Sequence, residues 1–152
     1  MKALSIKQPW ASLIAHGIKN IENRTWKTNF RGRIYIHASA KQSGTPVELL
    51  NANQIDLMNN HWTTSPYPNR PLSAIIGEVD IVDCVINHPS IWAEKTPGIY
   101  DGVPMKERVI IYNWVLANPI LYYKPIINVK GKLSFWEFEK PIINQKSLDT
   151  LV

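Results

Sequence analysis

Three charged side chains in the stretch "GIKNIENRTW" (residues 17–26) could form a functional site. Lys19, Glu22 and Arg24 bring an amine, a carboxylate and a guanidinium within six positions of the chain. Lysine and arginine can hold phosphate or carbonyl oxygens, and a glutamate can orient the lysine or accept a proton. The alternative is a solvated strand with a surface ion pair, which contributes about 0–1 kcal/mol to stability. The spacing alone leaves both interpretations open.

A catalytic role would make a specific demand on Lys19. A lysine acts as a base or nucleophile only when its pKa falls well below the reference value of about 10.4. Burial and the nearby Arg24 would lower the pKa of Lys19, whereas Glu22 would raise it. The trio therefore fits the binding of an anion or a polar base at least as well as catalysis, and Lys19 and Glu22 are the candidate catalytic residues.

A basic stretch with interleaved aromatic residues continues from this cluster. Such a pattern suits single-stranded RNA, through phosphate contacts and base stacking, although a soluble basic strand pair would look the same. The stretch contains Arg24, Trp26, Lys27, Phe30, Arg31 and Arg33. Four further residues could reach the same cleft and complete the candidate binding set, namely His37, Ser39, Lys41 and Ser134. For His37, a hydrogen-bonded wall residue is the alternative.

The elements that must position these residues begin with a strand and a short helix. Leu4 and Ile6 alternate with polar neighbours, which is typical of a strand. Pro9 suits the first turn of a helix over residues 9–16, whose apolar stripe includes Leu13 and Ile14. Gly17 is a natural helix stop, so the charged cluster follows directly after a turn.

The middle of the chain predicts a strand, a helix and a longer strand. In "RGRIYIHASA" (31–40), the even-numbered residues from Ile34 are apolar and face the core, while Arg33 to Ser39 alternate on the other face. "TPVELLNANQIDLMNN" (45–60) predicts a helix with a capping box between Thr45 and Glu48. "SAIIGEVDIVDCVIN" (73–87) predicts a strand whose alternation slips at Ile81–Val82, as at a bulge.

The C-terminal third predicts a long loop over residues 87–105 and further strands. "RVIIYNWVLANP" (108–119) reads as a strand ended by Pro119. "PIINVKGKLSFWEFEKP" (125–141) suggests two strand pieces around a turn at Lys130–Gly131. We expect a domain over residues 1–140 and a poorly ordered tail over 141–152.

Composition limits the classes of function. The chain has 152 residues and a net charge of +5, which fits one basic domain and is compatible with nucleic acid without requiring it. Cys84 is the single cysteine, so neither a disulfide framework nor a cysteine-rich zinc site is expected. The scattered histidines predict no metal site, and no motif predicts a cofactor. The sequence shows no signal peptide and no membrane span, so we expect a cytoplasmic protein without membrane contacts.

The order of these segments resembles the ASCH domain family. The family signature G-x-K-x-x-E-x-R is filled by Gly17, Lys19, Glu22 and Arg24, and it is preceded by Gln8-Pro9-Trp10. The segments "RGRIYIHASAK", "GEVDIVDCV" and "NWVLANP" to "KGKLSFWEF" also match, so that the resemblance covers residues 3–139. It implies an α+β fold: a PUA-like small β-barrel of about five to seven mostly antiparallel strands with two or more flanking helices.

The resemblance also implies a class of ligand. Members of this family are thought to act on or near RNA, so RNA or a modified nucleoside is the expected partner of a cleft beside the signature. One bacterial branch resembles an amidohydrolase of N4-acetylcytidine with a catalytic signature lysine, followed by threonines where this chain has Asn20 and Glu22. Other members are described as ribonucleases. A hydrolase acting on RNA or an acylated cytidine, and a protein-interaction module, are therefore the alternatives to a binding domain.

Overall fold

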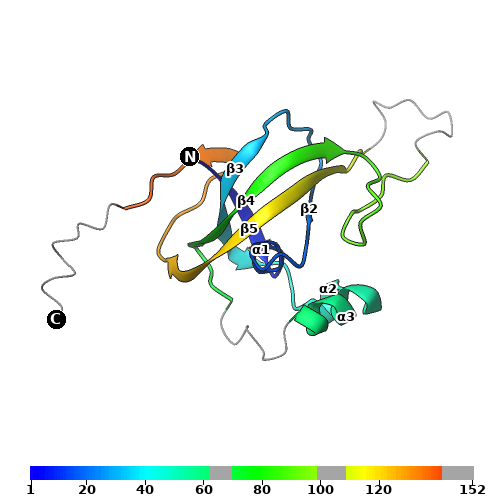
Figure 1. Cartoon of the computed structure of the whole chain (residues 1–152), viewed down its shortest axis with the longest axis horizontal. Helices are drawn as coiled ribbons and strands as arrows, with labels where there is room; N and C mark the ends of the chain where they lie inside the picture. Colours follow the sequence, from blue (N-terminus) through cyan, green and yellow to red (C-terminus); the bar gives the residue numbers. More distant parts are fainter. Residues whose placement is uncertain (62–69, 99–108, 142–152) are drawn as a thin grey trace, which may run out of the picture.

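The computed structural model describes residues 1–61, 70–98 and 109–141. All three helices of the described residues lie in the first half of the chain, between strands, and the described residues of the second half form strands and irregular segments (Figure 1). The elements are β1 (Lys2–Gln8), α1 (Trp10–Ala15), β2 (Ile21–Arg24), β3 (Gly32–Gln42), α2 (Pro46–Leu49), α3 (Ala52–His61), β4 (Ala74–Val85), β5 (Tyr112–Ile126) and β6 (Phe135–Glu137).

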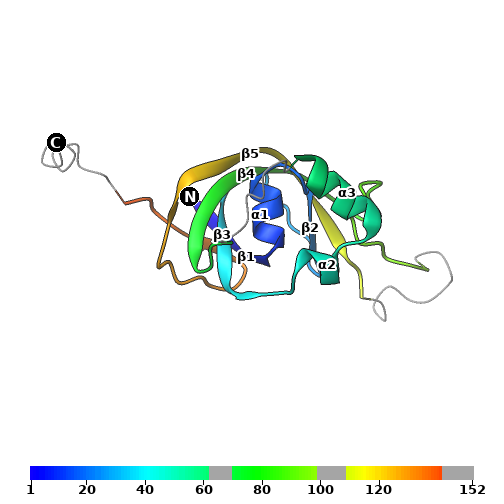
Figure 2. The same ribbon diagram turned by 90° about the horizontal axis from the view of Figure 1, so that it is seen from below.

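The strands form one sheet in the order β2-β5-β4-β3-β1-β6, with α1 enclosed by its curve (Figure 2). All neighbouring pairs are antiparallel except β1 and β3. The inner face carries Ile34 and Ile36, which pack with Ala11 and Ile14 of α1 in the largest core cluster. The expected α+β class and the alternation of β3 are therefore confirmed.

The sheet does not close into a barrel by backbone pairing. Strands β2 and β6 are its two edges, and they are not hydrogen-bonded to each other. Side chains bridge the gap instead: Arg24 on β2 donates from Nη2 to the carbonyl oxygen of Ser5 on β1 at 2.9 Å. The ring of Trp26 meets that of Phe135 edge-on, with centroids 5.7 Å apart. Since β6 pairs only with residues 2–4 of β1, the rest of β1 faces β2 across the gap. The barrel expected from the sequence is thus a curved open sheet with a seam between β2 and β1.

The turn after α1 brings the charged cluster to this seam. As predicted, the helix stops at Gly17, which has a φ of +75°. The backbone N–H groups of Ile18 and Lys19 then both donate to the carbonyl oxygen of Leu13, at 3.0 and 3.1 Å. This tight C-terminal turn directs the chain straight into β2.

The helix predicted over residues 45–60 is divided in two. Leu50, between α2 and α3, has an extended backbone, and its side chain is buried against Leu13 and Trp92. Thr45 makes no side-chain capping bond, so the predicted capping box is wrong. A reciprocal cap forms instead at Asn51 and Gln54, whose side chains each bind the other's backbone N–H at 2.9 and 3.0 Å. Burial of Leu50 therefore outweighs helix continuity.

Pro119 lies inside β5 and does not end the strand as predicted. The pairing of β5 with β4 shifts register between Glu78 and Asp80, and Asn118 has a φ of +52°. Such a bulge accommodates a proline because its missing N–H is not needed in the ladder. The slip predicted at Ile81–Val82 is confirmed by a second register shift.

At the C-terminal end, a short strand, β6, forms after Gly131, while residues 127–134 are irregular. The predicted loop over residues 87–105 is described only as far as residue 98, and the predicted tail, apart from Pro141, lies outside the described residues.

Candidate functional site

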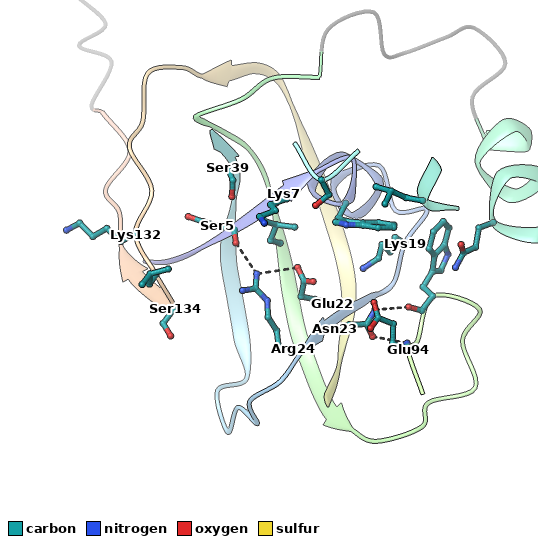
Figure 3. Close-up of a pocket in the computed structure, with 17 residues that line it drawn as sticks. Ser5, Lys7, Lys19, Glu22, Asn23, Arg24, Ser39, Glu94, Lys132 and Ser134 are labelled. Atoms are coloured by element: carbon teal, nitrogen blue, oxygen red, sulfur yellow. Dashed lines mark hydrogen bonds and ion pairs between the residues drawn. The ribbon is translucent and has the colours of Figure 1, made fainter. Parts of the chain in front are cut away.

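A cleft of about 680 Å³ lies at the seam where the sheet fails to close. Its walls come from the strands β1, β2 and β3, the helices α1, α2 and α3, the loop after β4 and the irregular segment before β6. Figure 3 shows the lining side chains, with Lys19, Glu22 and Arg24 directed into a common space. Elements distant in sequence therefore converge on the predicted charged cluster.

Lys19 is the most deeply placed cation of this cluster. Its residue is only 4% exposed, and its Nζ donates to the backbone carbonyl of Ile21. Nζ also lies 5.4 Å from the centre of the Trp10 ring, a cation–π contact. Burial lowers the pKa of Lys19 from its usual value; the charges of Glu22 and Glu94 oppose this shift, and Arg24 adds to it. The amine is thus closer to deprotonation than a surface lysine.

Glu22 is a buried carboxylate with few partners. Its side chain is 9% exposed, and Oε2 lies 3.6 Å from Nη2 of Arg24. This separation allows electrostatic attraction but is too long for a hydrogen bond, and within the described part of the chain Oε2 has no hydrogen-bond partner. A buried carboxylate oxygen without a donor is costly, so a ligand or solvent N–H or O–H group would be favoured here.

Arg24 is held in place at the mouth of the cleft. Among the described residues, both polar contacts of its guanidinium are made by Nη2, one with the Ser5 carbonyl and one with Glu22. The guanidinium carbon also lies 6.0 Å from the centre of the Trp114 ring, which is completely buried. A side chain fixed in this way can present its remaining N–H donors with little loss of entropy.

The loop after β4 supplies parts of the cleft that the sequence did not reveal. Asn23 holds this loop: its Nδ2 donates to the Trp92 carbonyl at 3.0 Å, and its Oδ1 accepts from the Glu94 N–H at 3.0 Å. Trp92 is buried, and its Nε1 has no hydrogen-bond partner among the described residues. Lys7 and Lys132 complete the missed cations. No local pattern could have identified Trp92, Glu94, Lys7 and Lys132, because they reach the cleft only through tertiary contacts.

Comparison with known proteins assigns the chain to a family. The profile of the ASCH domain matches residues 4–126. This chain belongs to the ASCH domain family. It is similar to Activating signal cointegrator 1 of Homo sapiens, with 36% identity over 150 residues, and to the same-named protein of Mus musculus, with 35% identity. In both cases 91% of this chain is matched, but it spans only 22% of the relative's length. The resemblance inferred from the signature is thereby confirmed.

Within this ASCH domain, the structure brings five of the predicted site residues to the cleft and leaves six outside it. Those lining the cleft are Lys19, Glu22, Arg24, Ser39 and Ser134. Those that do not line it are Trp26, Lys27, Arg31, Arg33, His37 and Lys41.

His37 is part of a hydrogen-bonded wall on the outer face of the sheet. Its Nε2 donates to the Val129 carbonyl at 2.7 Å, so its Nδ1 accepts from the Ser5 hydroxyl at 2.9 Å. The Ser5 oxygen in turn accepts from Nε1 of Trp136 at 3.2 Å. Burial lowers the pKa of His37, against the opposing effect of the Val129 hydrogen bond, and so favours the neutral ring that this chain of bonds requires. The prediction of His37 as a ligand contact is not supported by its position.

The basic–aromatic stretch is also dispersed. Trp26 packs edge-on against Trp114, with centroids 4.5 Å apart. Arg31 lies 3.7 Å from Asp83, and Arg33 pairs with Asp80 at 3.0 Å on the outer face. Lys27 and Lys41 are exposed away from the cleft. Because side chains alternate along β3, Arg33 points to the outer face of the sheet, whereas Arg24 on β2 lines the cleft. Residues close in sequence therefore do not share one surface.

Two further features of the described residues bear on function. They contain no group of three or more histidine, cysteine, aspartate or glutamate side chains placed to hold a metal ion. Over the same ranges, no helix has the length and apolar character needed to cross a bilayer.

Proposed function

We propose that this ASCH domain binds single-stranded RNA or a modified nucleoside in the cleft around Lys19, Glu22 and Arg24. The observation that supports this most is the open cleft itself, in which two buried polar atoms, Oε2 of Glu22 and Nε1 of Trp92, have no hydrogen-bond partner among the described residues. Buried polar groups in proteins are nearly always paired, so such atoms beside an open space favour a ligand.

The chemistry of the lining matches a nucleotide. The half-buried Trp10 supplies an aromatic ring, and stacking of a base on such a ring contributes about 1–3 kcal/mol, while the buried Trp92 supplies an unpaired Nε1 donor. Lys19 and Arg24 can donate to the carbonyl oxygens of a base or to phosphate, while Glu22 can accept from an amino or imino group. A nucleobase carries both donors and acceptors on its edge, whereas a simple anion would leave Glu22 without a partner.

Binding of RNA can be tested by its salt dependence. A fluorescently labelled single-stranded RNA of about eight nucleotides would be titrated with the protein between about 50 and 200 mM salt. Affinity should fall as salt rises, with a logarithmic slope of about −0.7 for each phosphate neutralised on a single strand. No measurable affinity for any single-stranded RNA or nucleoside at low salt would overturn the proposal.

A matched pair of arginine variants locates the binding surface. Arg24→Gln removes a fixed guanidinium from the cleft, and Arg31→Gln removes one from outside it, with the same change of net charge. We expect Arg24→Gln to weaken binding at least about tenfold, because hydrogen bonds to charged groups contribute about 1.5–3 kcal/mol. Arg31→Gln should change affinity less than about twofold. Equal losses in the two variants would move the site out of the cleft.

A second function, hydrolysis, is favoured by one observation: Lys19 is buried and its pKa is lowered. In its neutral form, Lys19 could take a proton from water as the water oxygen attacks the acyl carbon of an N-acylated cytidine. The protonated Lys19 would then return this proton to the N4 nitrogen as the C–N bond breaks, releasing cytidine and the carboxylic acid. Turnover of acylated cytidines or RNA should increase with pH until Lys19 is fully neutral. Lys19→Ala should abolish turnover and Lys27→Ala should not; turnover that survives Lys19→Ala would exclude this role. The third possibility, a protein-interaction module, predicts a cleft filled by side chains, and the open cleft does not favour it.

A further inference from the structure

The two ends of the cleft differ in charge and chemistry. Lys132 and Ser134 lie at one end, and Lys7, Ser39 and Arg24 lie between that end and Glu22 (Figure 3). At the opposite end of the same view lie Lys19, Asn23 and Glu94. Glu22 stands between the two groups. A ligand that fills the cleft would therefore meet mostly cations and hydroxyls at one end, and a buried amine, an amide and a carboxylate at the other.

Several N–H donors on the cationic side of the cleft make no hydrogen bond to described residues. Both contacts of Arg24 use Nη2, so within the described residues its Nη1 and Nε donate no hydrogen bond. Lys7 and Lys132 are exposed, and neither makes an ion pair or side-chain hydrogen bond in that part of the chain. Even after Glu22 balances one charge, these three cations leave a local excess of two positive charges. An anchored arginine near the exposed Lys7, with Lys132 farther along the same side of the cleft, is a combination that suits a phosphate group.

The other end suits a base and disfavours an anion. Glu94 and Glu22 would repel a phosphate placed beside Lys19, and the amine of Lys19 is already bound to the Ile21 carbonyl. Here the aromatic ring of Trp10 lies against Lys19, and Trp92 is close to Asn23. Stacking surfaces with mixed donors and acceptors are the features that recognise a base edge.

We infer that the cleft holds one nucleotide in a fixed orientation, with its base beside the Trp10 ring, Lys19 and Nε1 of Trp92, and its phosphate at Lys7 and Arg24, on the side of the cleft that leads to Lys132. This inference rests on the proposed function and adds to it a phosphate subsite and a direction. It implies that the ligand is a nucleotide, free or within a strand, and that the unphosphorylated nucleoside binds less tightly.

The test measures how much a phosphate adds to binding. The four common nucleosides, their 5′-monophosphates and their 3′-monophosphates would be titrated by calorimetry at low salt. We expect at least one nucleotide to bind about tenfold more tightly than its nucleoside, because charge-assisted hydrogen bonds form in the subsite. Tighter binding of either the 5′- or the 3′-monophosphate supports the subsite. The comparison of the two monophosphates shows which side of the sugar faces the subsite.

A double variant and its control separate the subsite from general charge. Lys7→Gln with Lys132→Gln should remove most of the phosphate gain and leave nucleoside affinity within about twofold. Lys41→Gln with Lys124→Gln removes two exposed lysines outside the cleft and should leave the gain intact. Nucleosides that bind as tightly as their nucleotides, or a gain that survives the Lys7 and Lys132 changes, would overturn this inference alone. Failure of every nucleoside and nucleotide to bind would instead overturn the proposed function.

Discussion

Two clusters that each pair an arginine with a glutamate lie on different parts of the sheet, and they differ in how fully the glutamate is bonded. Each holds one buried atom without a hydrogen-bond partner among the described residues: Nη1 of Arg33 on the outer face and Oε2 of Glu22 in the cleft. On the outer face, Glu78 accepts a hydrogen bond from Tyr122 and another from Lys140 at 3.2 Å, and it lies 3.9 Å from Arg33. Arg33 also pairs with Asp80 at 3.0 Å. In the cleft, Oε2 of Glu22 accepts no hydrogen bond from a described residue and lies 3.6 Å from Nη2 of Arg24.

The pKa directions reflect the same difference. Burial alone would raise the pKa of Glu78, but the hydrogen bonds from Tyr122 and Lys140, with the charges of Lys140 and Arg33, outweigh it and lower that pKa. Lys19 shows the opposite balance, because burial dominates over the attraction of Glu22 and Glu94 and lowers its pKa. Protein groups stabilise the charged form on the outer face, whereas in the cleft they do not fully compensate for burial. We take a carboxylate without a hydrogen-bond donor in the lining of a cleft as the feature that separates the candidate site from a structural ion-pair network.

The largest expected effect comes from removing each glutamate in turn. Glu78→Ala leaves Arg33, Lys140 and the Tyr122 hydroxyl without their shared acceptor, and should lower the free energy of unfolding by about 2–3 kcal/mol. Glu22→Ala should cost about 1 kcal/mol or less, since it removes one long ion pair, but it should weaken RNA binding. Urea denaturation and RNA titration of both variants test this. A Glu22→Ala loss of stability as large as that of Glu78→Ala would remove the distinction between the clusters.

Measuring stability as a function of pH tests whether the pKa of Lys19 is lowered by burial. Burial disfavours the charged amine of Lys19 more than Glu22 and Glu94 favour it, so Lys19→Met, which removes the charge at similar volume, should be more stable than the wild type at neutral pH, by about 1–2 kcal/mol. Since the folded-state pKa of Lys19 lies below 10.5, the unfolded chain binds more protons between these two values, and wild-type stability rises with pH there.

The stability advantage of Lys19→Met should therefore shrink as the pH approaches 10.5. Chemical denaturation at several pH values measures it, with the exposed Lys27→Met as the control. A pH-independent difference between Lys19→Met and the wild type would contradict the lowered pKa.

Trp92→Phe isolates a single unpaired donor. The change removes the Nε1 N–H, which has no partner among the described residues, and keeps most of the buried aromatic surface. Folding stability should stay within about 1 kcal/mol of the wild type or increase, while RNA affinity falls. Trp114→Phe is the matched control, because its N–H donates to the Trp26 carbonyl at 3.2 Å and its loss should reduce stability. Unchanged RNA binding by Trp92→Phe would remove this group from the site.

The smallest effect is expected at a surface pair. Arg31 and Asp83 lie 3.7 Å apart with exposed side chains, so Arg31→Ala should change the free energy of unfolding by less than about 0.5 kcal/mol. Thermal denaturation at low and high salt would measure it. A larger loss would mean that ion pairs outside the Glu22 and Glu78 clusters also stabilise the fold.

The sequence identified the charged residues that line the cleft together because they are local to one short stretch. The turn at Gly17 and the short strand β2 place Lys19, Glu22 and Arg24 within a few residues of one another. Their neighbours in the cleft could not be predicted, since Trp92 and Glu94 arrive through the hydrogen bonds of Asn23 to a distant loop. Such tertiary contacts leave no periodic signal in the chain.

The predicted fold was correct where local patterns agree with tertiary packing, as in α1, β3 and the bulge of β4. It was wrong where packing overrides the local pattern. Burial of Leu50 splits the predicted helix over residues 45–60, and the bulge at Asn118 carries Pro119 inside a strand. The closed barrel expected from the family gave way to a seam, and that seam is where the candidate site lies.

The most direct test of the central claim follows the indole N–H signals of the tryptophans by NMR as single-stranded RNA is added. The cleft account predicts that the signals of Trp10 and Trp92 shift and saturate together at the RNA concentration that saturates binding, while the signal of the fully buried Trp114 stays in place. Unchanged Trp10 and Trp92 signals, with shifts confined to the backbone around Lys27, Arg31 and Arg33, would contradict the account and place the RNA on the basic stretch instead.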